Sequence, residues 1–224
     1  MKLEQLSDDV TLYLGDCLDI LPTLEAGSVD FAWTDPPYNV GKDYGTARDD
    51  YPDDEYLAMT ALWTDELKRI SDNKLCVYTP MKYMLEYWNI LGKDYKQIIL
   101  SYSPEGAFRY GFVNQHSSLL TNVKPIKKTK NVWHNCQMTG LGYFFKENNY
   151  NHPGYTSLDI NKRVISSFTH PGQTIIDPFA GSGTTLVAAI QLGRKAIGIE
   201  IDETYYEIAK KRIRQAMLQM RLEI

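Results

Sequence analysis

The tetrapeptide Asp35-Pro36-Pro37-Tyr38 is the part of the chain best equipped to do chemistry. It follows the apolar run 31–33, which predicts a buried strand, and α/β sheets place catalytic groups at the carboxyl ends of such strands. Two successive prolines continue neither a helix nor a ladder, so the backbone leaves the strand in a stiff, extended conformation. The set suits a flat ring bearing an amino group: Asp35 and the Pro36 carbonyl accept its hydrogens, and Tyr38 covers its face.

A second motif lies near the far end of the chain. The β-branched stretch 174–176 predicts a strand, the segment 177–185 (Asp-Pro-Phe-Ala-Gly-Ser-Gly-Thr-Thr) a glycine turn, and 186–192 a helix. A further strand signal at 196–199 ends in Glu200, where an acid can hold both hydroxyls of a ribose. No Gly-Lys-Ser/Thr follows the glycines, which excludes a Walker phosphate loop. The rigid turn favours a nucleoside ligand without a pyrophosphate, and S-adenosylmethionine is the obvious candidate.

With both motifs in view, the chain resembles the amino-methylating DNA methyltransferases, which modify adenine N6 or cytosine N4. Residues 35–38 match the catalytic tetrapeptide of that family, and 177–183 match its cofactor loop. The catalytic motif comes first and the cofactor motif last, which is the circularly permuted beta arrangement. The resemblance implies a Rossmann-like, S-adenosylmethionine-dependent methyltransferase fold of the α/β class, with a mostly parallel sheet and helices on both faces.

The resemblance also assigns roles to residues. The catalytic motif is matched by Asp35, Pro36, Pro37 and Tyr38. The cofactor-binding segments are matched by Asp16, Cys17, Asp35, Asp177, Pro178, Phe179, Ala180, Gly181, Ser182, Gly183, Thr184, Glu200 and Ile201. The stretch 39–44 is similar to the mobile loop that follows the family's tetrapeptide.

One segment departs from the family's pattern. Where relatives carry a segment like His-Pro-Thr-Gln-Lys-Pro, this chain has His-Pro-Gly-Tyr-Thr-Ser at 152–157. His152 is either the family's histidine or an ordinary turn histidine. Thr156, Ser157 or backbone amides near Asp159 are the candidates to hold the methionine carboxylate instead.

The predicted mechanism follows from the chemistry of an aromatic amine, whose lone pair is delocalised into its ring. Accepting both amino hydrogens at Asp35 and the Pro36 carbonyl localises that lone pair and stabilises the developing positive charge. The target base must leave the duplex, and Tyr38 then replaces the lost stacking. Neither a metal nor a covalent intermediate is required.

Resemblance also orders the candidate functions. An initial Asp in the tetrapeptide is the family's usual adenine form, so we expect transfer to adenine N6 in a specific double-stranded DNA sequence. The first alternative is cytosine N4, and the second is a non-catalytic subunit that recognises DNA for a partner.

Length and composition predict a single domain over residues 1–224, and the resemblance implies that it is a methyltransferase domain. Hydrophobic residues make up 43% of the chain and charged residues 23%, which is enough apolar material for a core. No apolar stretch approaches membrane length, and the first residues lack a signal-peptide core. Cys17, Cys76 and Cys136 are scattered without CxxC spacing, so we expect small core residues in a reducing cytoplasm, in a bacterial, archaeal or phage-infected cell.

Charge is unevenly distributed along the chain. The formal net charge of −4 does not describe a general polyanion binder, but the acidity gathers at 8–9, 49–50 and 53–55. A basic segment at 124–130 precedes Trp133. We predict DNA phosphate contacts from this region, namely from Lys124, Lys127, Lys128, Lys130 and His134. A second basic cluster, 210–214, is interpreted as the charged outer side of an amphipathic final helix.

The remaining patterns place the elements around these motifs. Strands are predicted at 11–14, 31–34, 75–79, 97–102 and 117–121, and helices at 55–70, 81–91 and 158–168. A short DNA-recognition insert is expected at about 122–156. Because the insert is short, the recognised sequence is brief or a homodimer supplies additional contacts.

Overall fold

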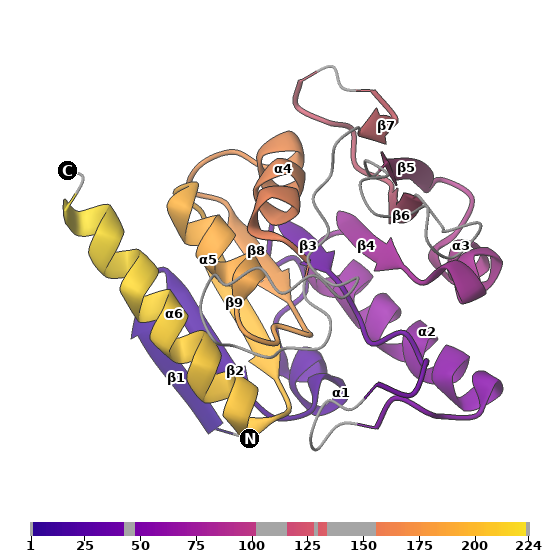
Figure 1. Cartoon of the computed structure of the whole chain (residues 1–224), viewed down its shortest axis with the longest axis horizontal. Coiled ribbons are helices and arrows are strands. Elements are labelled where there is room, and N and C mark those ends of the chain that lie inside the picture. Colours follow the sequence, from indigo (N-terminus) through magenta and orange to yellow (C-terminus); the bar gives the residue numbers. More distant parts are fainter. Residues whose placement is uncertain (1, 43–47, 102–115, 128–129, 134–155, 223–224) are drawn as a thin grey trace, which may run out of the picture.

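One sheet forms the centre of the protein. The computed structural model describes residues 2–42, 48–101, 116–127, 130–133 and 156–222, and within them nine strands are ordered β1-β2-β9-β8-β3-β4-β6-β5-β7 (Figure 1). The strands are β1 (Lys2–Ser7), β2 (Val10–Leu14), β3 (Phe31–Thr34), β4 (Leu75–Thr79), β5 (Lys96–Ser101), β6 (His116–Thr121), β7 (Val132–Trp133), β8 (Thr174–Asp177) and β9 (Lys195–Glu200).

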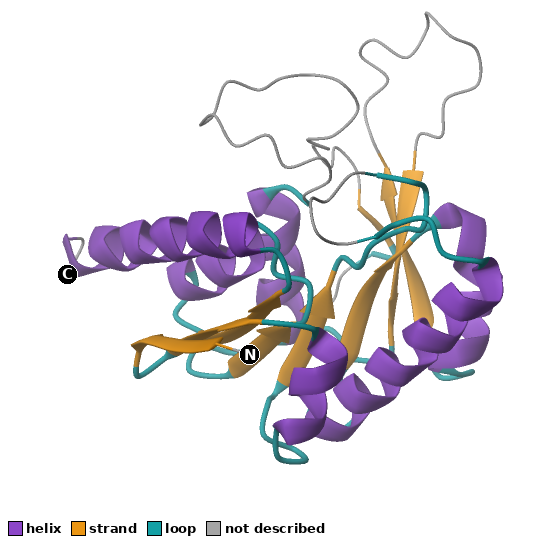
Figure 2. Cartoon of the chain, turned by 90° about the horizontal axis from the view of Figure 1, so that it is seen from below, coloured by secondary structure: helices purple, strands orange, loops and turns teal. Residues whose placement is uncertain are grey.

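Helices cover both faces of this sheet (Figure 2). They are α1 (Cys17–Ile20), α2 (Asp53–Ile70), α3 (Met84–Leu91), α4 (Leu158–Phe168), α5 (Thr184–Gln191) and α6 (Glu203–Leu222), with 3₁₀ turns η1 (Leu21–Thr23) and η2 (Met81–Tyr83). The helices α4, α5 and α6 share one apolar core, which includes Ile160 and Leu186. The helices α1, α2 and α3 share a second core, which includes Leu67 and Tyr87. None of the described helices is both long and apolar enough to cross a bilayer.

The middle of the sheet is parallel, as the sequence predicted. The strands β2, β9, β8, β3 and β4 run in one direction, whereas β1 and β6 are antiparallel to their neighbours. Since both faces are covered, the central strands do not alternate between buried and exposed residues, and every residue of β3 and β4 is buried. The carboxyl ends of the parallel strands therefore meet at one edge.

Most predicted elements are found, and the differences have local causes. β3, β4 and α4 have the predicted bounds, while the helix predicted at 81–91 begins as the 3₁₀ turn η2 before α3. The strand β1 was missed because four of its six residues are polar and none of the six is buried. Part of the predicted insert belongs to the sheet, since Val132 and Trp133 pair with Ile99 and Leu100 of β5. Residues 134–155 lie outside the described residues.

The last helix corrects one interpretation. Its apolar side is buried as predicted at Ala209, Ile213 and Ala216. Its basic residues, however, do not all face solvent. Lys210 and Arg214 both bind Glu4 of β1, each at 2.7 Å. Arg212 donates to the Ser182 carbonyl and hydroxyl oxygens at 2.6 Å and to Thr184 Oγ1 at 3.1 Å, so it braces the turn before α5.

Gly183 caps the start of α5 with a left-handed φ of +81°. A Cβ built there would lie 3.0 Å from Cβ and 3.1 Å from Cα of Ala209, so α6 packs directly on this glycine. Its role in the structure is close helix packing, and it is the one residue of the predicted cofactor set that does not line the pocket described below.

We expect Gly183→Ala to lower the free energy of unfolding more than Gly172→Ala. Gly172 has a similar φ of +84° but nothing within 4 Å of its Cβ position. Both variants should lose about 1–2 kcal/mol from the left-handed backbone, and overpacking against Ala209 should add about 1–3 kcal/mol for Gly183 only. Urea denaturation measures the difference, and equal losses would contradict the packing role.

Candidate active site

A pocket of about 360 Å³ lies at the carboxyl edge of the parallel strands and brings the two sequence motifs together. β3 and β8 are neighbours, with Phe31 opposite Ile175 and Ala32 opposite Ile176, so the chain leaves both strands side by side. All four residues of the catalytic tetrapeptide line this pocket. It is also lined by Asp16, Cys17, Asp177, Pro178, Phe179, Ala180, Gly181, Ser182, Thr184, Glu200 and Ile201.

Asp35 follows β3 and has both carboxylate oxygens engaged. Oδ1 accepts a hydrogen bond from the Tyr38 hydroxyl and Oδ2 accepts one from the Thr156 hydroxyl. Burial raises the pKa of Asp35 to about 6, opposed by these two hydrogen bonds; nearby Asp177 raises it further, and Lys42 lowers it. The carboxylate is therefore charged at neutral pH and available as an acceptor.

The two prolines present their carbonyls differently. The Pro37 carbonyl accepts from the Tyr56 hydroxyl at 2.8 Å, and that hydroxyl also lies 2.7 Å from the hydroxyl of Tyr87. Burial raises the pKa of Tyr56 above its usual range, so it stays a neutral donor. Among the hydrogen bonds of the described residues, none is donated to the Pro36 carbonyl. Asp35 and the Pro36 carbonyl are thus the acceptors that the tetrapeptide offers to the pocket.

Two neighbouring side chains contact the Tyr38 ring. The Tyr78 ring of β4 stacks on it with centroids 6.0 Å apart and an interplanar angle of 17°. Lys42 Nζ lies over the Tyr38 ring, 5.4 Å from its centroid. Both contacts limit the movement of a ring that the sequence assigns to stacking.

Glu200 ends β9 at the pocket wall and is 8% exposed. Its two oxygens accept from the Gly181 amide at 2.7 Å and the Asp202 amide at 2.8 Å, which fixes the carboxylate. Burial raises its pKa to about 7, opposed by these amides. Gly181 adopts a φ of +53°, and Glu200 Oε2 thereby lies against the turn.

Two other acids of the predicted cofactor set shape the chain locally. Asp177 is 3% exposed and accepts from the Thr34 hydroxyl at 2.9 Å and the Phe179 amide at 3.1 Å. Burial raises its pKa to about 6. Asp16 caps α1 by accepting from the Leu18 amide at 2.9 Å, which turns the chain along the pocket.

Several contacts of this site were not predicted. Thr156, expected only as a candidate holder of the methionine carboxylate, donates to Asp35. Asn161 of α4 accepts from the Trp33 indole at 2.6 Å and the Thr185 hydroxyl at 2.9 Å. Asn161 also donates to the carbonyls of Thr156 and Ser157. Single polar residues inside a helical pattern carry no spacing signal. Arg212 was hidden in the basic run of α6, which resembles any solvated helix side.

The structure describes residues 156 and 157 of the segment 152–157, which departs from the family's pattern. Thr156 donates to Asp35 and Ser157 caps α4 by accepting from the Ile160 amide at 3.3 Å, so both candidate holders of a methionine carboxylate have partners within the protein. His152 lies outside the described residues. Cys17 and Cys76 are buried thiols whose pKa burial raises above the usual range, while Cys136 is not described.

Three of the predicted DNA-contacting residues are described, and none of these three lines the pocket. Lys124, Lys127 and Lys130 are exposed, and the Ile126 amide donates to the Ser167 carbonyl of α4 at 2.7 Å. Lys128 and His134 lie outside the described residues. Trp133 is fully buried with the Arg163 guanidinium 4.4 Å over its ring, so this aromatic neighbour of the basic segment belongs to the core.

A family model for DNA methylases of the N6/N4 type matches residues 81–211, more than half of the chain. The chain belongs to this family. It is the family that the two motifs and their order predicted, and its methyl donor is S-adenosylmethionine.

Three curated relatives of this DNA methylase cover most of the chain. Type II methyltransferase M.HpaI of Haemophilus parainfluenzae is 28% identical over 237 residues, or 92% of this chain and 74% of the relative. The methylase YubD of Escherichia coli (strain K12) is 30% identical over 217 residues, which cover 89% of this chain and 88% of the relative. DNA adenine methyltransferase YhdJ of the same organism is 27% identical over 241 residues, which cover 91% of this chain and 82% of the relative.

Solved structures show the same fold. The complex of M1.HpyAVI with S-adenosylmethionine aligns with a TM-score of 0.67 at 22% identity, covering 91% of this chain and 98% of that one. The cytosine-N4-specific PvuII DNA methyltransferase aligns with a TM-score of 0.65 at 15% identity, covering 96% and 93%. The predicted Rossmann-like methyltransferase fold is thereby confirmed.

The raised pKa of Asp35 predicts a pH-dependent gain in stability from Asp35→Asn. A carboxyl whose folded pKa lies above its unfolded value destabilises the fold when ionised, so its cost grows as pH rises through the folded pKa. The variant should be more stable than wild type at pH 8, and this advantage should shrink by about 1 kcal/mol at pH 5. Urea denaturation of both proteins at pH 5 and pH 8 measures the difference in stability, and Asp94→Asn, at an exposed aspartate, is the control. An advantage that does not change with pH would contradict a raised pKa for Asp35.

Proposed function

We propose that this methylase transfers a methyl group from S-adenosylmethionine to the exocyclic N6 amino group of adenine in a specific double-stranded DNA sequence. The proposal is carried by one observation: Asp35 and Pro36, whose carbonyl accepts no hydrogen bond from the described residues, line the same pocket as Glu200 and residues 177–182 of the turn.

The residues of the tetrapeptide have different roles in activating the amine. Asp35 and the Pro36 carbonyl accept its two hydrogens, which localises the nitrogen lone pair and stabilises the positive charge that develops there. Their position on a rigid strand end provides the alignment for in-line displacement. Tyr38, steadied by Tyr78, offers a stacking face to the base once it has left the duplex. The Tyr38 and Thr156 hydroxyls on Asp35 keep the carboxylate oriented before the substrate arrives.

The pocket fits the cofactor in size and in chemistry. Its volume lies in the range of small-molecule sites. Glu200 is fixed by two backbone amides and keeps lone pairs for the ribose hydroxyls. Phe179 and Ile201 supply apolar wall for the adenine ring, and Asp16 lies at the same wall. Bound there, S-adenosylmethionine would supply an electrophilic methyl group beside Asp35.

Adenine is preferred over cytosine for two reasons. The tetrapeptide begins with Asp35, the usual adenine form in the family, and the relative YhdJ is named a DNA adenine methyltransferase. Cytosine N4 is the alternative, because the PvuII enzyme of similar fold is cytosine-N4-specific. A non-catalytic subunit is disfavoured by the complete set of Asp35, Tyr38 and Gly181.

Labelled methyl groups test the target directly. Unmethylated duplex DNA treated with protein and methyl-labelled S-adenosylmethionine, then digested to nucleosides, should carry label on N6-methyladenine. Asp35→Ala should abolish the label, while titration calorimetry should still show S-adenosylmethionine binding. Label on N4-methylcytosine would replace the proposal with its alternative, and unlabelled DNA would end both.

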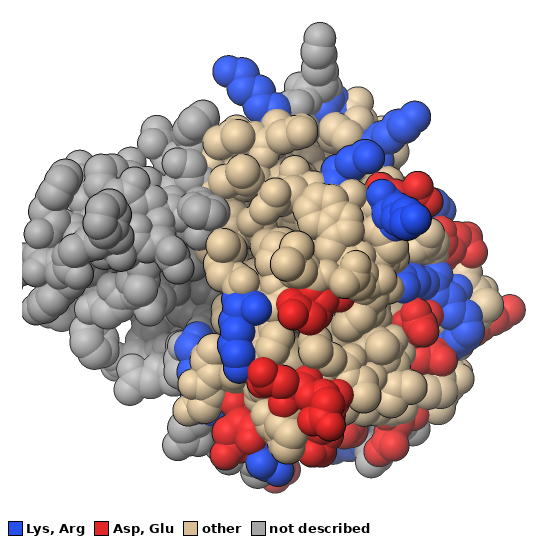
Figure 3. Space-filling view, turned by 90° about the vertical axis from the view of Figure 1, so that its right-hand side faces the viewer, with Lys and Arg blue, Asp and Glu red and all other residues tan. Residues whose placement is uncertain are grey.

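We further propose that Lys124, Lys127 and Lys130 contact phosphates. The face that carries α2 and α3 has Lys and Arg interspersed with Asp and Glu, so it offers no continuous basic stripe (Figure 3). The exposed lysines between β6 and β7 are the alternative that the described residues provide. A homodimer that extends the DNA contacts stays a prediction.

Salt dependence distinguishes phosphate contacts from a solvated loop. Replacing Lys124 and Lys127 with alanine should flatten the slope of log affinity against log salt by about two and weaken binding to all sequences alike. The matched control replaces Lys74 and Lys93, which are exposed near the amino ends of β4 and β5, away from the pocket edge. An unchanged slope in the first variant would refute phosphate contact by these lysines.

A further inference from the structure

The stretch directly after the catalytic tetrapeptide is organised by one buried acid. Asp49 is 3% exposed, and its carboxylate accepts from the amides of Asn39 at 2.7 Å, Val40 at 3.2 Å and Lys42 at 3.0 Å. The Gly41 amide donates to the Asp49 carbonyl at 2.7 Å. Four consecutive amides thus donate to a single residue, and a charged acceptor makes three of these bonds strong.

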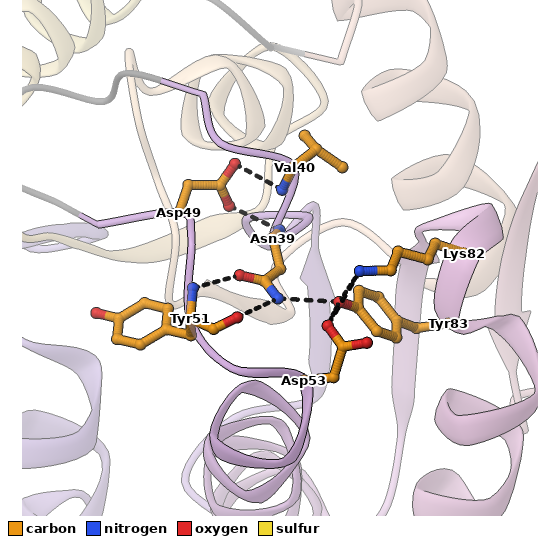
Figure 4. Close-up of polar contacts among 7 residues, drawn as sticks. All are labelled: Asn39, Val40, Asp49, Tyr51, Asp53, Lys82 and Tyr83. Atoms are coloured by element: carbon orange, nitrogen blue, oxygen red, sulfur yellow. Dashed lines mark hydrogen bonds and ion pairs between the residues drawn. The ribbon is translucent and has the colours of Figure 1, made fainter.

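Asn39 makes the turn that allows this arrangement. Its φ of +54° is left-handed, a conformation in which asparagine is favoured among non-glycine residues. Its side chain accepts from the Tyr51 amide at 2.7 Å and donates to the Tyr51 carbonyl and the Tyr83 hydroxyl, each at 2.9 Å (Figure 4). The stretch is therefore fastened to the segment before α2 and to η2.

The Tyr83 hydroxyl extends this network to the first turn of α2. It donates to Asp53 Oδ1 at 2.6 Å and accepts from Lys82 Nζ at 2.6 Å, and Lys82 also pairs with Asp53 at 3.0 Å (Figure 4). These outer partners are exposed, so the buried bonds of Asp49 and Asn39 hold most of the arrangement.

The fastened stretch delivers two side chains to the pocket. Tyr38 precedes Asn39, and its hydroxyl contacts Asp35. Lys42, whose amide is held by Asp49, lines the pocket with Nζ 5.4 Å from the Tyr38 ring centroid. Asp49 is also a pocket residue, but it faces the backbone and not Asp35. Its influence on the site passes through the residues it holds.

We propose that Asp49 is a positioning residue for the target-base site: it holds the backbone of residues 39–42 so that Tyr38 and Lys42 keep their places beside Asp35. The inference rests on the proposed role of Asp35 and Tyr38 in capturing the base. It gives Lys42 a function as well, because a cation fixed there steadies the Tyr38 ring and lowers the pKa of Asp35.

Adjacent aspartates provide the matched pair for a test. Asp50 is the neighbour of Asp49, but its side chain is 71% exposed and pairs only with Arg48 among the described residues. Asp49→Asn places an amide N–H₂ against backbone N–H groups, whereas Asp50→Asn disturbs no backbone bond. The two substitutions change net charge equally, so charge alone cannot separate them.

We expect Asp49→Asn to lower kcat/KM for DNA by about 10–100-fold, as a small misplacement of reacting groups does. Affinity for S-adenosylmethionine should change by less than about twofold, because Glu200 and the 177–184 turn are untouched. Fluorescence of a duplex with 2-aminopurine at the target position should show impaired base capture. Asp50→Asn should match wild type in all three measurements.

The pH–rate profile provides a readout that loss of fold would not move. Asp35 faces Lys42, Asp177, and the hydroxyls of Tyr38, Thr156 and Tyr87. Of these, Lys42 is the cation, so displacing it raises the pKa of Asp35 and moves the acid limb of kcat/KM to higher pH. Lys42→Met should reproduce this shift with the backbone bonds intact, and Lys42→Arg should restore the wild-type limb.

The outcomes separate this inference from the proposed function. If wild type leaves DNA unmethylated, both fall. If wild type methylates DNA and Asp49→Asn behaves like Asp50→Asn, only the positioning role of Asp49 is overturned. Should Asp49→Asn fail to fold, Asp49→Glu takes its place, because it keeps the carboxylate but moves it away from the three amides. Undiminished base capture and an unmoved acid limb in that variant overturn the inference.

Discussion

The pairing of β3 with β8 is the contact on which the rest of the site depends. These parallel strands are joined by hydrogen bonds although their partners lie 143 residues or more apart in the chain, as the Thr34 hydroxyl and Asp177 carboxylate illustrate. One strand runs into the catalytic tetrapeptide and the other into the cofactor turn. Because parallel strands end at the same edge, a methyl donor and a target amine can meet between them.

The second feature of the site is the concentration of buried carboxylates. Asp35, Asp177 and Glu200 all have a raised pKa, and burial is the largest cause in each case. Hydroxyl and amide donors offset part of that cost without neutralising the charge. The arrangement lowers stability at neutral pH, and in return it keeps preorganised acceptors in a largely apolar pocket, where they can act on a developing positive charge.

Acidic residues therefore have two different roles in this chain, one internal and one at the surface. The run 49–50 reads as one patch of negative charge, yet Asp49 is buried and organises the backbone after the tetrapeptide while Asp50 faces solvent. Basic residues divide similarly, since Arg212 braces the turn before α5 and Lys124 is exposed. Net charge thus says little about how this protein meets DNA, because part of it is committed to internal bonds.

The sequence by itself determined the family, the order of the motifs, the central strands and nearly every residue of the tetrapeptide and cofactor turn that lines the pocket. Those features are local: apolar runs, prolines and glycines fix backbone conformation over a few residues. Tertiary structure alone decided that Thr156 would meet Asp35, that Asn161 would join β3 to α4 and α5, that Gly183 would serve helix packing, and that Asp49 would be buried. Each of these depends on which segments the fold brings together, over 10 residues for Asp49 and Asn39 and over 121 for Thr156 and Asp35, and such contacts leave no periodic trace in the chain.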